Sequence, residues 1–341
     1  MDATTIGIDL AKDVFEVAIS ARPGQVGARR RLTRRQFSQF VDMLVPQTTV
    51  VMEACGTAHY WARRCQARGA AVQLVPPRYV RPYVRRNKTD RTDAEALLEA
   101  HRCAGIHPVP VKTVEQQTIQ TLHRVRQQWQ TTRTARINLV RAILREQGLT
   151  LPAGAHGLRR RLAVLLADET AVPSLTRETL HALLDELGAI DARLAAMDAR
   201  LGALARTHPL AIRLQQIPGV GPLTATALVG SVPHLHAFRR GRAFASWLGL
   251  TPRVRASGHR RQTGRISKEG DRYLRTLLAH GARSVLRTAA RHPESRLHQW
   301  AATVATRRGQ PRAIMAVANK LARIIWAVGH GEQTYAMRPA R

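Results

Sequence analysis

The chain has 341 residues, with 54 Lys or Arg against 23 Asp or Glu, and a formal net charge of +31. This length allows two or three domains, and the charge far exceeds what solubility requires, so it indicates a polyanionic partner. The excess is concentrated, because residues 238–341 hold 22 Lys or Arg and four Asp or Glu, a net +18. The composition favours a protein that binds nucleic acid, with a basic protein that lacks this role as the alternative.

Disulfide frameworks, zinc sites and membrane spans are not expected. Three widely spaced cysteines, Cys55, Cys65 and Cys103, match neither a disulfide nor a zinc pattern. The opening MDATTIGIDL lacks the basic and apolar regions of a signal peptide. No apolar stretch reaches the ~20 residues that a bilayer requires. We therefore expect a cytoplasmic protein with no membrane partner.

The first 113 residues are predicted to form an α/β domain. Thr4–Leu10 and Val14–Ser20 carry the β-branched and alternating apolar residues of strands. A third strand, a helix capped by Thr33 and a short buried strand at Thr48–Met52 are expected to follow. A further helix, strand and helix complete the pattern. Hairpin strands followed by alternating strands and helices indicate a mixed sheet.

Four acidic residues of this domain stand at the ends of predicted elements. Asp9 ends the first strand, Glu53 follows the central strand, and Asp90 and Asp93 lie where a helix is expected to open with a Thr92 capping box. Such carboxylates can converge at one edge of a sheet, where they suit Mg²⁺ bridged to phosphates. Two ions could clamp the attacking and leaving oxygens of a phosphodiester. Each acid alone could instead be a turn, cap or helix-dipole residue.

Residues 114–206 are predicted to form long helices. A polar helical pattern covers residues 114–148, and after a break at Pro152–Gly157 a short and a long helical run follow. The narrow apolar stripes indicate antiparallel helices with a coiled-coil seam. Both a monomeric helical hairpin and an exposed seam that joins two chains fit this pattern.

Residues 207–341 are expected to form a mainly helical domain. Within it, IPGVGPLTATAL, with Gly219 and Gly221, has the helix-hairpin-helix pattern. In that motif hairpin amides and a helix N-terminus hold a phosphate without reading bases. An ordinary tight turn between two helices is the alternative. Further helices are expected at residues 238–250, 268–286 and 311–328.

The basic segment 251–275 is the most distinctive stretch of the chain. Eight Arg or Lys surround Ser257, which lies in an Ala-Ser-Gly turn expected to be flexible, and Gly258 would allow a nucleic-acid strand to approach. A hydroxyl among guanidinium groups suits phosphodiester chemistry, because cations neutralise the phosphate and stabilise developing charge. The side chains expected to hold phosphates are Arg253, Arg255, Arg260, Arg261 and Lys268. A solvated basic loop with an inert serine is the alternative.

Together these motifs resemble those of the DEDD insertion-sequence transposases of the IS110 family, especially its IS1111 branch. The matching segments cover nearly the whole chain: GIDLAKDVFEVAI, MEACGTAHYW, KTDRTDAEAL, IPGVGPLTATAL, WLGLTPRVRASG and GRISKEGDRYLR. The resemblance implies an RNase H-like (RuvC-like) domain at residues 1–113, whose acids Asp9, Glu53, Asp90 and Asp93 bind Mg²⁺. A helical coiled-coil arm at residues 114–206 and a C-terminal transposase domain at residues 207–341 complete the expected organisation.

The resemblance also implies a serine nucleophile, which maps onto Ser257. Many relatives read Ser-Ser-Gly where this chain reads Ala256-Ser257-Gly258, so Ser257 is the sole serine of the turn, and Ser246 and Ser267 are less favoured. The expected reaction is DNA strand exchange through a covalent phosphoserine link, assisted by Mg²⁺.

The partners implied by the resemblance are donor and target DNA and a structured non-coding guide (bridge) RNA, whose pairing would supply sequence recognition. Dimers would assemble into tetramers, with the acids of one subunit completing the site around the serine of another. The setting would be the prokaryotic cytoplasm, at the nucleoid. The alternatives are a metal-only RuvC-like nuclease with an inert Ser257, and a catalytically inactive nucleic-acid-binding relative.

Overall fold

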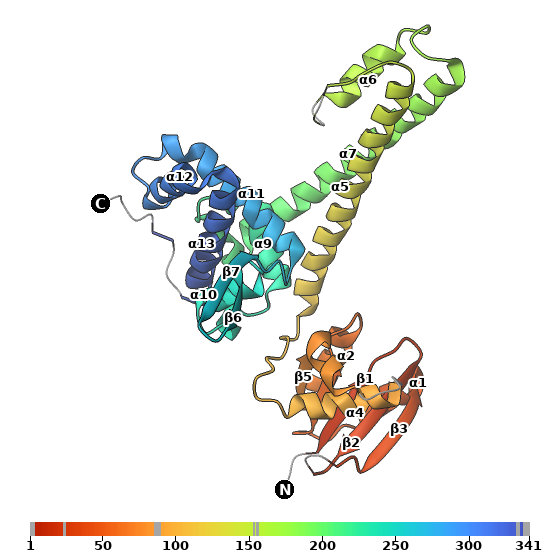
Figure 1. Ribbon diagram of the computed structural model, residues 1–341. Coiled ribbons are helices and arrows are strands. Elements are labelled where there is room, and N and C mark those ends of the chain that lie inside the picture. The colour runs from red at the N-terminus through yellow and green to blue at the C-terminus, as the bar shows by residue number, and fades with distance from the viewer. Residues whose placement is uncertain are drawn as a thin grey trace. The chain divides into compact units, whose positions relative to one another are not determined.

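The structure is a computed structural model that describes residues 4–22, 25–84, 90–152, 154, 157–331 and 335–336, apart from the side chains of residues 90 and 91. The chain divides into two compact units, Met1–Val114 and Glu115–Arg341 (Figure 1). Within the described ranges, every helix is too short or too polar to cross a bilayer.

The first unit is built on a five-stranded mixed sheet. Its strands are β1 (Thr5–Asp9), β2 (Val14–Ser20), β3 (Ala28–Thr33), β4 (Thr49–Glu53) and β5 (Ala71–Val75), in the order β3-β2-β1-β4-β5. β1, β2 and β3 are antiparallel neighbours, whereas β4 and β5 run parallel to β1. The predicted mixed α/β sheet is thus confirmed, and it is compatible with an RNase H-like fold.

Aromatic packing fixes one face of this sheet. The helices α1 (Arg34–Asp42) and α2 (Ala58–Gln66) place Phe37 and Trp61 against Phe15 of β2, with ring centroids 4.2 Å apart for Phe15 and Phe37. Thr33 caps α1, as predicted, and the structure adds a capping box with Gln36. All three aromatic side chains are at most 2% exposed, so they anchor both helices on the sheet.

The helix α4 (Asp90–His101) covers the opposite face, after the short α3 (Pro77–Val80) and η1 (Arg81–Tyr83). Gly7 lets it approach closely, because a Cβ there would lie 2.4 Å from the Ala94 carbonyl oxygen and 3.1 Å from Leu98. The predicted start at a Thr92 cap is wrong, since Thr92 lies inside the first turn. Packing on the sheet holds the helix in place, and an acidic first residue is favoured by the helix dipole.

An antiparallel pair of long helices begins the second unit. α5 (Val114–Glu146) and α7 (Ser174–Thr207) are joined through α6 (Leu158–Leu166), and Figure 1 shows them crossing at the centre of the arm. Ion pairs link them in antiparallel order: Arg126 with Asp198, Arg133 with Asp191, and Arg136 with Glu186. Leucines and isoleucines of α5, α6 and α7 form an apolar cluster beyond these pairs. The predicted helices are therefore present, paired within one chain.

Helices also make up the core of the remaining chain. They are α8 (Pro209–Gln215), α9 (Pro222–Ser231), η2 (Leu235–Ala237), α10 (Gly241–Trp247), α11 (Arg272–Thr288), η3 (Ala289–Arg291), α12 (Arg296–Arg308) and α13 (Gln310–His330). The predicted helix at residues 238–250 is shorter than expected, and α12 was not predicted. Leu274, Leu278, Val317 and Leu321 are fully buried where α11 and α13 pack together.

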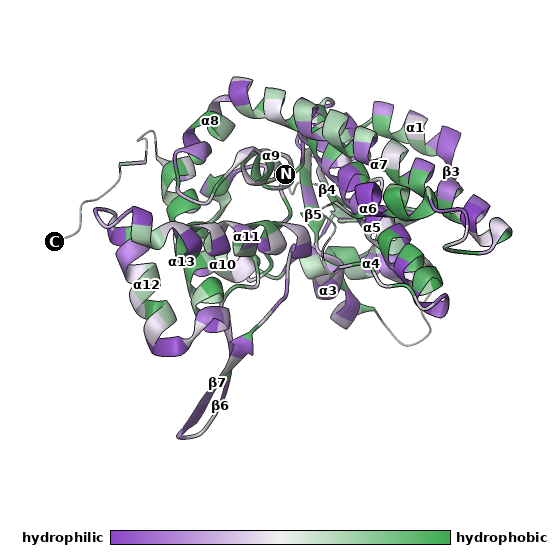
Figure 2. Cartoon of the chain, turned by 90° about the horizontal axis from the view of Figure 1, so that it is seen from above, coloured by the Kyte–Doolittle hydropathy of each residue, from purple (hydrophilic) through white to green (hydrophobic). Residues whose placement is uncertain are grey.

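A two-stranded hairpin replaces the flexible turn predicted around Ser257. β6 (Pro252–Ser257) pairs antiparallel with β7 (Arg260–Ile266), and Ser257 lies opposite Arg260. Gly258 and His259 form the turn, with φ +53° at Gly258, as a type II′ turn requires of its first central residue. Figure 2 shows this basic hairpin (residues 252–266) extending from the helices as a mostly hydrophilic ribbon.

Candidate active site

Two acidic residues stand at neighbouring strand ends in the first unit. Asp9 ends β1 and Glu53 ends β4, and these parallel strands pair Ile8 with Met52, one residue earlier. Ile8 and Met52 are fully buried in the cluster beneath α1 and α2. Because side chains alternate along a strand, residues 9 and 53 belong to the opposite face, on which Gly7 meets α4. Asp9 and Glu53 thus share one edge and one face of the sheet, here called the acid edge.

The other two predicted metal ligands belong to α4. Asp90 is its first residue, and Asp93 directly precedes Ala94, whose carbonyl approaches Gly7. Asp93 is half-buried, whereas the Asp90 side chain lies outside the described residues. Among the side chains that are described, no group of three or more His, Cys, Asp or Glu lies close enough to hold a metal ion. The four-carboxylate magnesium site therefore stays a prediction, with a donor set of the right chemical type.

Ser257 belongs to the second unit, at the turn end of the basic hairpin. All of β6 is exposed, and so is β7 up to Arg265. Residues 252–266 include five arginines and no Asp or Glu. The hydroxyl of Ser257 is therefore accessible in a strongly positive environment, where an anionic strand would be attracted.

The register of the hairpin divides the predicted phosphate-binding residues between its two faces. Arg255 and Ser257 are two residues apart on β6, so they share a face, and their cross-strand partners are Gln262 and Arg260. Arg261 pairs with Ala256 and therefore belongs to the other face. The structure thus groups Arg255 and Arg260 with Ser257 and separates Arg261 from them.

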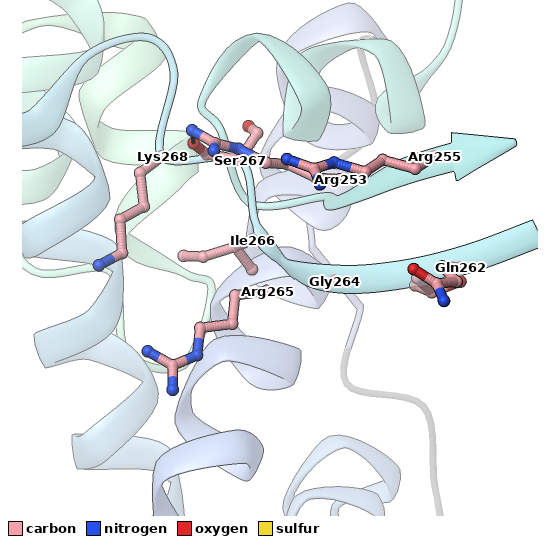
Figure 3. A pocket seen from close by; sticks show the side chains of 9 residues that line it. Arg253, Arg255, Gln262, Gly264, Arg265, Ile266, Ser267 and Lys268 are labelled. Carbon is pink, nitrogen blue, oxygen red and sulfur yellow. Dashed lines mark hydrogen bonds between the residues drawn. The ribbon is translucent and has the colours of Figure 1, made fainter.

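A pocket opens at the base of the hairpin (Figure 3). Its volume is about 560 Å³, and its lining includes the cations Arg253, Arg255, Arg265 and Lys268. The remaining lining residues are Gln262, Thr263, Gly264, Ile266 and Ser267. Sequence reasoning named Arg253, Arg255 and Lys268 but missed Arg265, Gln262 and Thr263. A Gly-X pair between basic strands was the signal for the hairpin that could have found them.

The two less favoured serines lie near the base of the hairpin. Ser246 is exposed near the end of α10, and the Thr251 hydroxyl lies 3.3 Å from its Oγ. Ser267 is half-buried after β7, and its backbone oxygen accepts a 3.0 Å hydrogen bond from Arg253. Of the three serines, Ser257 alone lies within the hairpin, at its turn.

The two glycines of the turn between α8 and α9 have different surroundings. Gly219 has φ +82°, and a Cβ there would lie 2.6 Å from the Gly281 carbonyl oxygen of α11. Gly221 instead is exposed before Pro222, with no atom within 4 Å of its Cβ position. Gly219 thus serves close packing on α11, while phosphate binding at either glycine stays a prediction.

A buried polar network at the base of the arm was not predicted. His123 of α5 is 3% exposed, and its ring nitrogens lie 3.0 Å from the hydroxyls of Tyr273 and Thr226. The Thr226 hydroxyl donates to the Pro222 carbonyl, so we assign it as the acceptor from His123 Nε2–H and Tyr273 as the donor to Nδ1. Burial, with a smaller effect of Arg126, lowers the pKa of His123 to about 4. The network ties α5 to α9 and α11 with a neutral imidazole.

Comparison with known proteins gives matches along the chain. A family model described as "Transposase IS116/IS110/IS902 family" matches residues 211–299, and a second, for DEDD transposases and described as "Transposase", matches residues 6–148. The chain is 42% identical to a "Probable family 20 transposase" of Pseudomonas aeruginosa, over 98% of this chain and 99% of the relative.

Two named insertion-sequence transposases are similar over comparable lengths. Identity is 40% to the transposase for element IS1111A of Coxiella burnetii, over 98% of this chain and 92% of the relative. It is 35% to the transposase for element IS1328 of Yersinia enterocolitica, with 96% and 97% covered. The similarity therefore extends through both units.

Proposed function

Because this chain belongs to the IS116/IS110/IS902 family of transposases, we propose that it exchanges DNA strands through a covalent link to Ser257. The family makes it an enzyme that acts on DNA. The observation that supports the serine step is the position of Ser257, which is exposed on an arginine-rich hairpin without a carboxylate and lies opposite Arg260.

The proposed reaction is a transesterification. The Ser257 oxygen attacks a DNA phosphorus, an Oγ–P bond forms, one P–O bond of the DNA backbone breaks, and the serine proton ends on the released oxygen. A hydroxyl of the exchanged strand then attacks the phosphoserine, which restores the serine and rejoins the DNA. Arg255 and Arg260, on the same face as Ser257, would neutralise the phosphate and its developing charge.

The acids are proposed to hold Mg²⁺. Asp9 and Glu53 at the acid edge, with Asp90 and Asp93 of α4, supply the oxygen donors that this ion prefers. The bound ion would stabilise negative charge on phosphate oxygens. The common face of Asp9 and Glu53, opened to α4 by Gly7, supports this assignment.

Guide RNA and higher assembly belong to the same proposal. A structured non-coding RNA would pair with donor and target DNA, so that the protein needs to bind backbone rather than read bases. The net charge of +31 supports an interaction with more nucleic acid than one duplex. Dimers would pair into tetramers, in which the acids and the serine of one site come from different subunits.

A covalent-trapping experiment tests the serine step. Wild type and Ser257→Ala would be incubated with the RNA transcribed beside the gene, donor and target DNA and Mg²⁺, and then separated on a denaturing gel. We expect a protein–DNA adduct in wild type that is lost in Ser257→Ala and kept in the matched control Ser246→Ala. Cleaved DNA without an adduct, equal in all variants, would instead establish a metal-only nuclease.

Subunit mixing tests the shared site. Asp9→Asn and Ser257→Ala protein, each inactive alone, are expected to regain adduct formation when co-assembled, because one subunit supplies the acids and another the serine. Assemblies that stay inactive after verified mixing would place both groups of a site in one chain.

A further inference from the structure

The pocket at the base of the basic hairpin is lined in part by Ser267 and Lys268 of the loop of residues 267–270. Lys268 has φ +56°, a left-handed conformation that is unfavourable for most residues with a Cβ. Strained backbone of this kind persists where surrounding contacts enforce it, and it concentrates at functional sites.

Close backbone contacts at two glycines, Gly249 and Gly270, hold the loop that contains Lys268 in this conformation. A Cβ on Gly270 would lie 1.9 Å from the Trp247 carbonyl oxygen, and one on Gly249 would lie 2.0 Å from the Glu269 carbonyl oxygen. The Lys268 amide donates a 3.1 Å hydrogen bond to the Gly249 carbonyl. The loop is thus locked against the end of α10 by backbone contacts.

Hydrogen bonds from two arginines add to this locking. Arg253 of β6 donates to the Ser267 carbonyl at 3.0 Å, and Arg275 of α11 donates to the Leu248 carbonyl at 3.0 Å and to the Glu269 carbonyl at 3.5 Å. The loop is therefore attached both to the hairpin and to the helical core, and Lys268 is one of the residues that line the pocket (Figure 3).

The lining of the pocket matches a phosphodiester backbone. Arg253, Arg255, Arg265 and Lys268 bring four positive charges to one open hollow, and its described lining contains no carboxylate. Gln262 and Thr263 add neutral polar groups able to donate to phosphate oxygens. Arg255 is two residues from Ser257 on one face, which is about 7 Å along a strand. A DNA strand bound at Ser257 can therefore continue directly into the pocket.

We propose that this pocket binds non-scissile phosphates of the DNA strand that Ser257 attacks, with Lys268 as a positioning residue preset by its loop. The inference rests on the proposed function for the identity of the attacked strand. The strained backbone at Lys268 would serve to position its ammonium group beside the backbone phosphate that neighbours the scissile phosphate.

The test separates the charge of Lys268 from its backbone. Lys268→Gly removes the charge and fits φ +56° without strain, so its melting temperature is expected to equal or exceed that of wild type. Its affinity for generic duplex DNA should fall about tenfold, and the slope of log affinity against log salt should become less steep by about one. Lys268→Asn, which tolerates the left-handed region, should match it, and Lys268→Arg should restore most of the binding.

A charge control and a second substrate complete the experiment. Arg102→Gln removes a cation already paired with Glu99, and should leave affinity and slope unchanged. With the DNA of the trapping assay, single phosphates would be replaced in turn by neutral methylphosphonate. The Lys268→Gly deficit should disappear at one position beside the scissile phosphate and persist at the others.

Two results would overturn the inference: wild-type affinity and slope in Lys268→Gly, or a deficit that is equal at every methylphosphonate position. Failure of the serine step is a separate result, because Ser257→Ala is expected to bind DNA normally. A wild type that forms no adduct while Lys268→Gly still lowers the salt slope would remove the proposed nucleophile and keep the phosphate pocket.

Discussion

The acid edge and the basic hairpin are positioned by different physical means. Asp9 and Glu53 each follow a fully buried residue, Ile8 and Met52, so the packed sheet sets the position of both strand ends. The hairpin is exposed along nearly all of its length, and its turn, its register and the loop of residues 267–270 determine its geometry. Substitutions beside the acid edge should therefore alter stability, whereas those in the hairpin should alter binding.

The largest effect is expected at the acid edge itself. Asp9→Asn should lower adduct formation and strand joining by about 10²- to 10³-fold, because it removes a proposed metal ligand. The melting temperature should change little, since Asp9 is not part of the apolar core. Gel quantification of adduct and joined DNA gives the measurement. Asp42→Asn, whose wild-type carboxylate pairs with Arg64 and Arg68 on α2 and just beyond it, serves as the control and should remain active. Equal losses in both variants would contradict a specific role of Asp9.

The buried His123 predicts a pH dependence of the unfolding free energy. Its pKa is about 4 in the folded chain against 6.5 as the ordinary value, so the unfolded chain binds the extra proton between these values. The unfolding free energy should therefore fall as pH decreases from about 6.5 to about 4, by at most about 3 kcal/mol from this group.

Denaturant titrations across that pH interval, in wild type and His123→Gln, measure this contribution. The variant should be less stable at neutral pH, because Tyr273 or Thr226 loses a partner, but it should lose less stability on acidification. The same slope with pH in both proteins would show that His123 is not the titrating group.

A pair of glycine substitutions compares the two regions directly. Gly7→Ala places a Cβ 2.4 Å from the Ala94 carbonyl, so it should destabilise the first unit by about 1–3 kcal/mol. Gly264→Ala in the hairpin meets its nearest atom at 3.7 Å, and the free energy of unfolding should change by less than about 1 kcal/mol. Equal destabilisation, measured by chemical denaturation, would show that the hairpin is packed as tightly as the sheet.

The smallest expected effect is a difference in the rate of adduct formation between substitutions on the two faces of the hairpin. Arg260→Gln should lower the rate of adduct formation about tenfold, because Arg260 lies opposite Ser257. Arg261→Gln removes the same charge from the other face and should weaken DNA binding without a matching loss of rate at saturating DNA. Identical rates for the two variants under saturation would mean that the face of the hairpin does not matter.

Much of the first unit could be predicted because its strands have alternating or continuous apolar residues and are bounded by turn and capping residues. Val14–Ser20 was predicted with its observed bounds, and Thr33 with Gln36 caps α1 through a local hydrogen-bond pattern. The predicted start of α4 was wrong, because the helix begins at Asp90 and includes Thr92. Its position on the sheet depends on the close contact with Gly7, which a local capping pattern does not reveal. The basic hairpin was missed because its strands expose almost every side chain and show no apolar alternation.

The sequence by itself determined the charge, the family motifs, the mixed sheet and the residues expected to act on a phosphodiester, because these depend on composition and local pattern. Tertiary structure decided that Asp9 and Glu53 share a face, that Arg261 is separated from Ser257, and that Gly219 packs on Gly281. It also decided that Lys268 is held in a left-handed conformation at a pocket. Each of these depends on strand register or close backbone contact between segments distant in sequence, which no local pattern specifies.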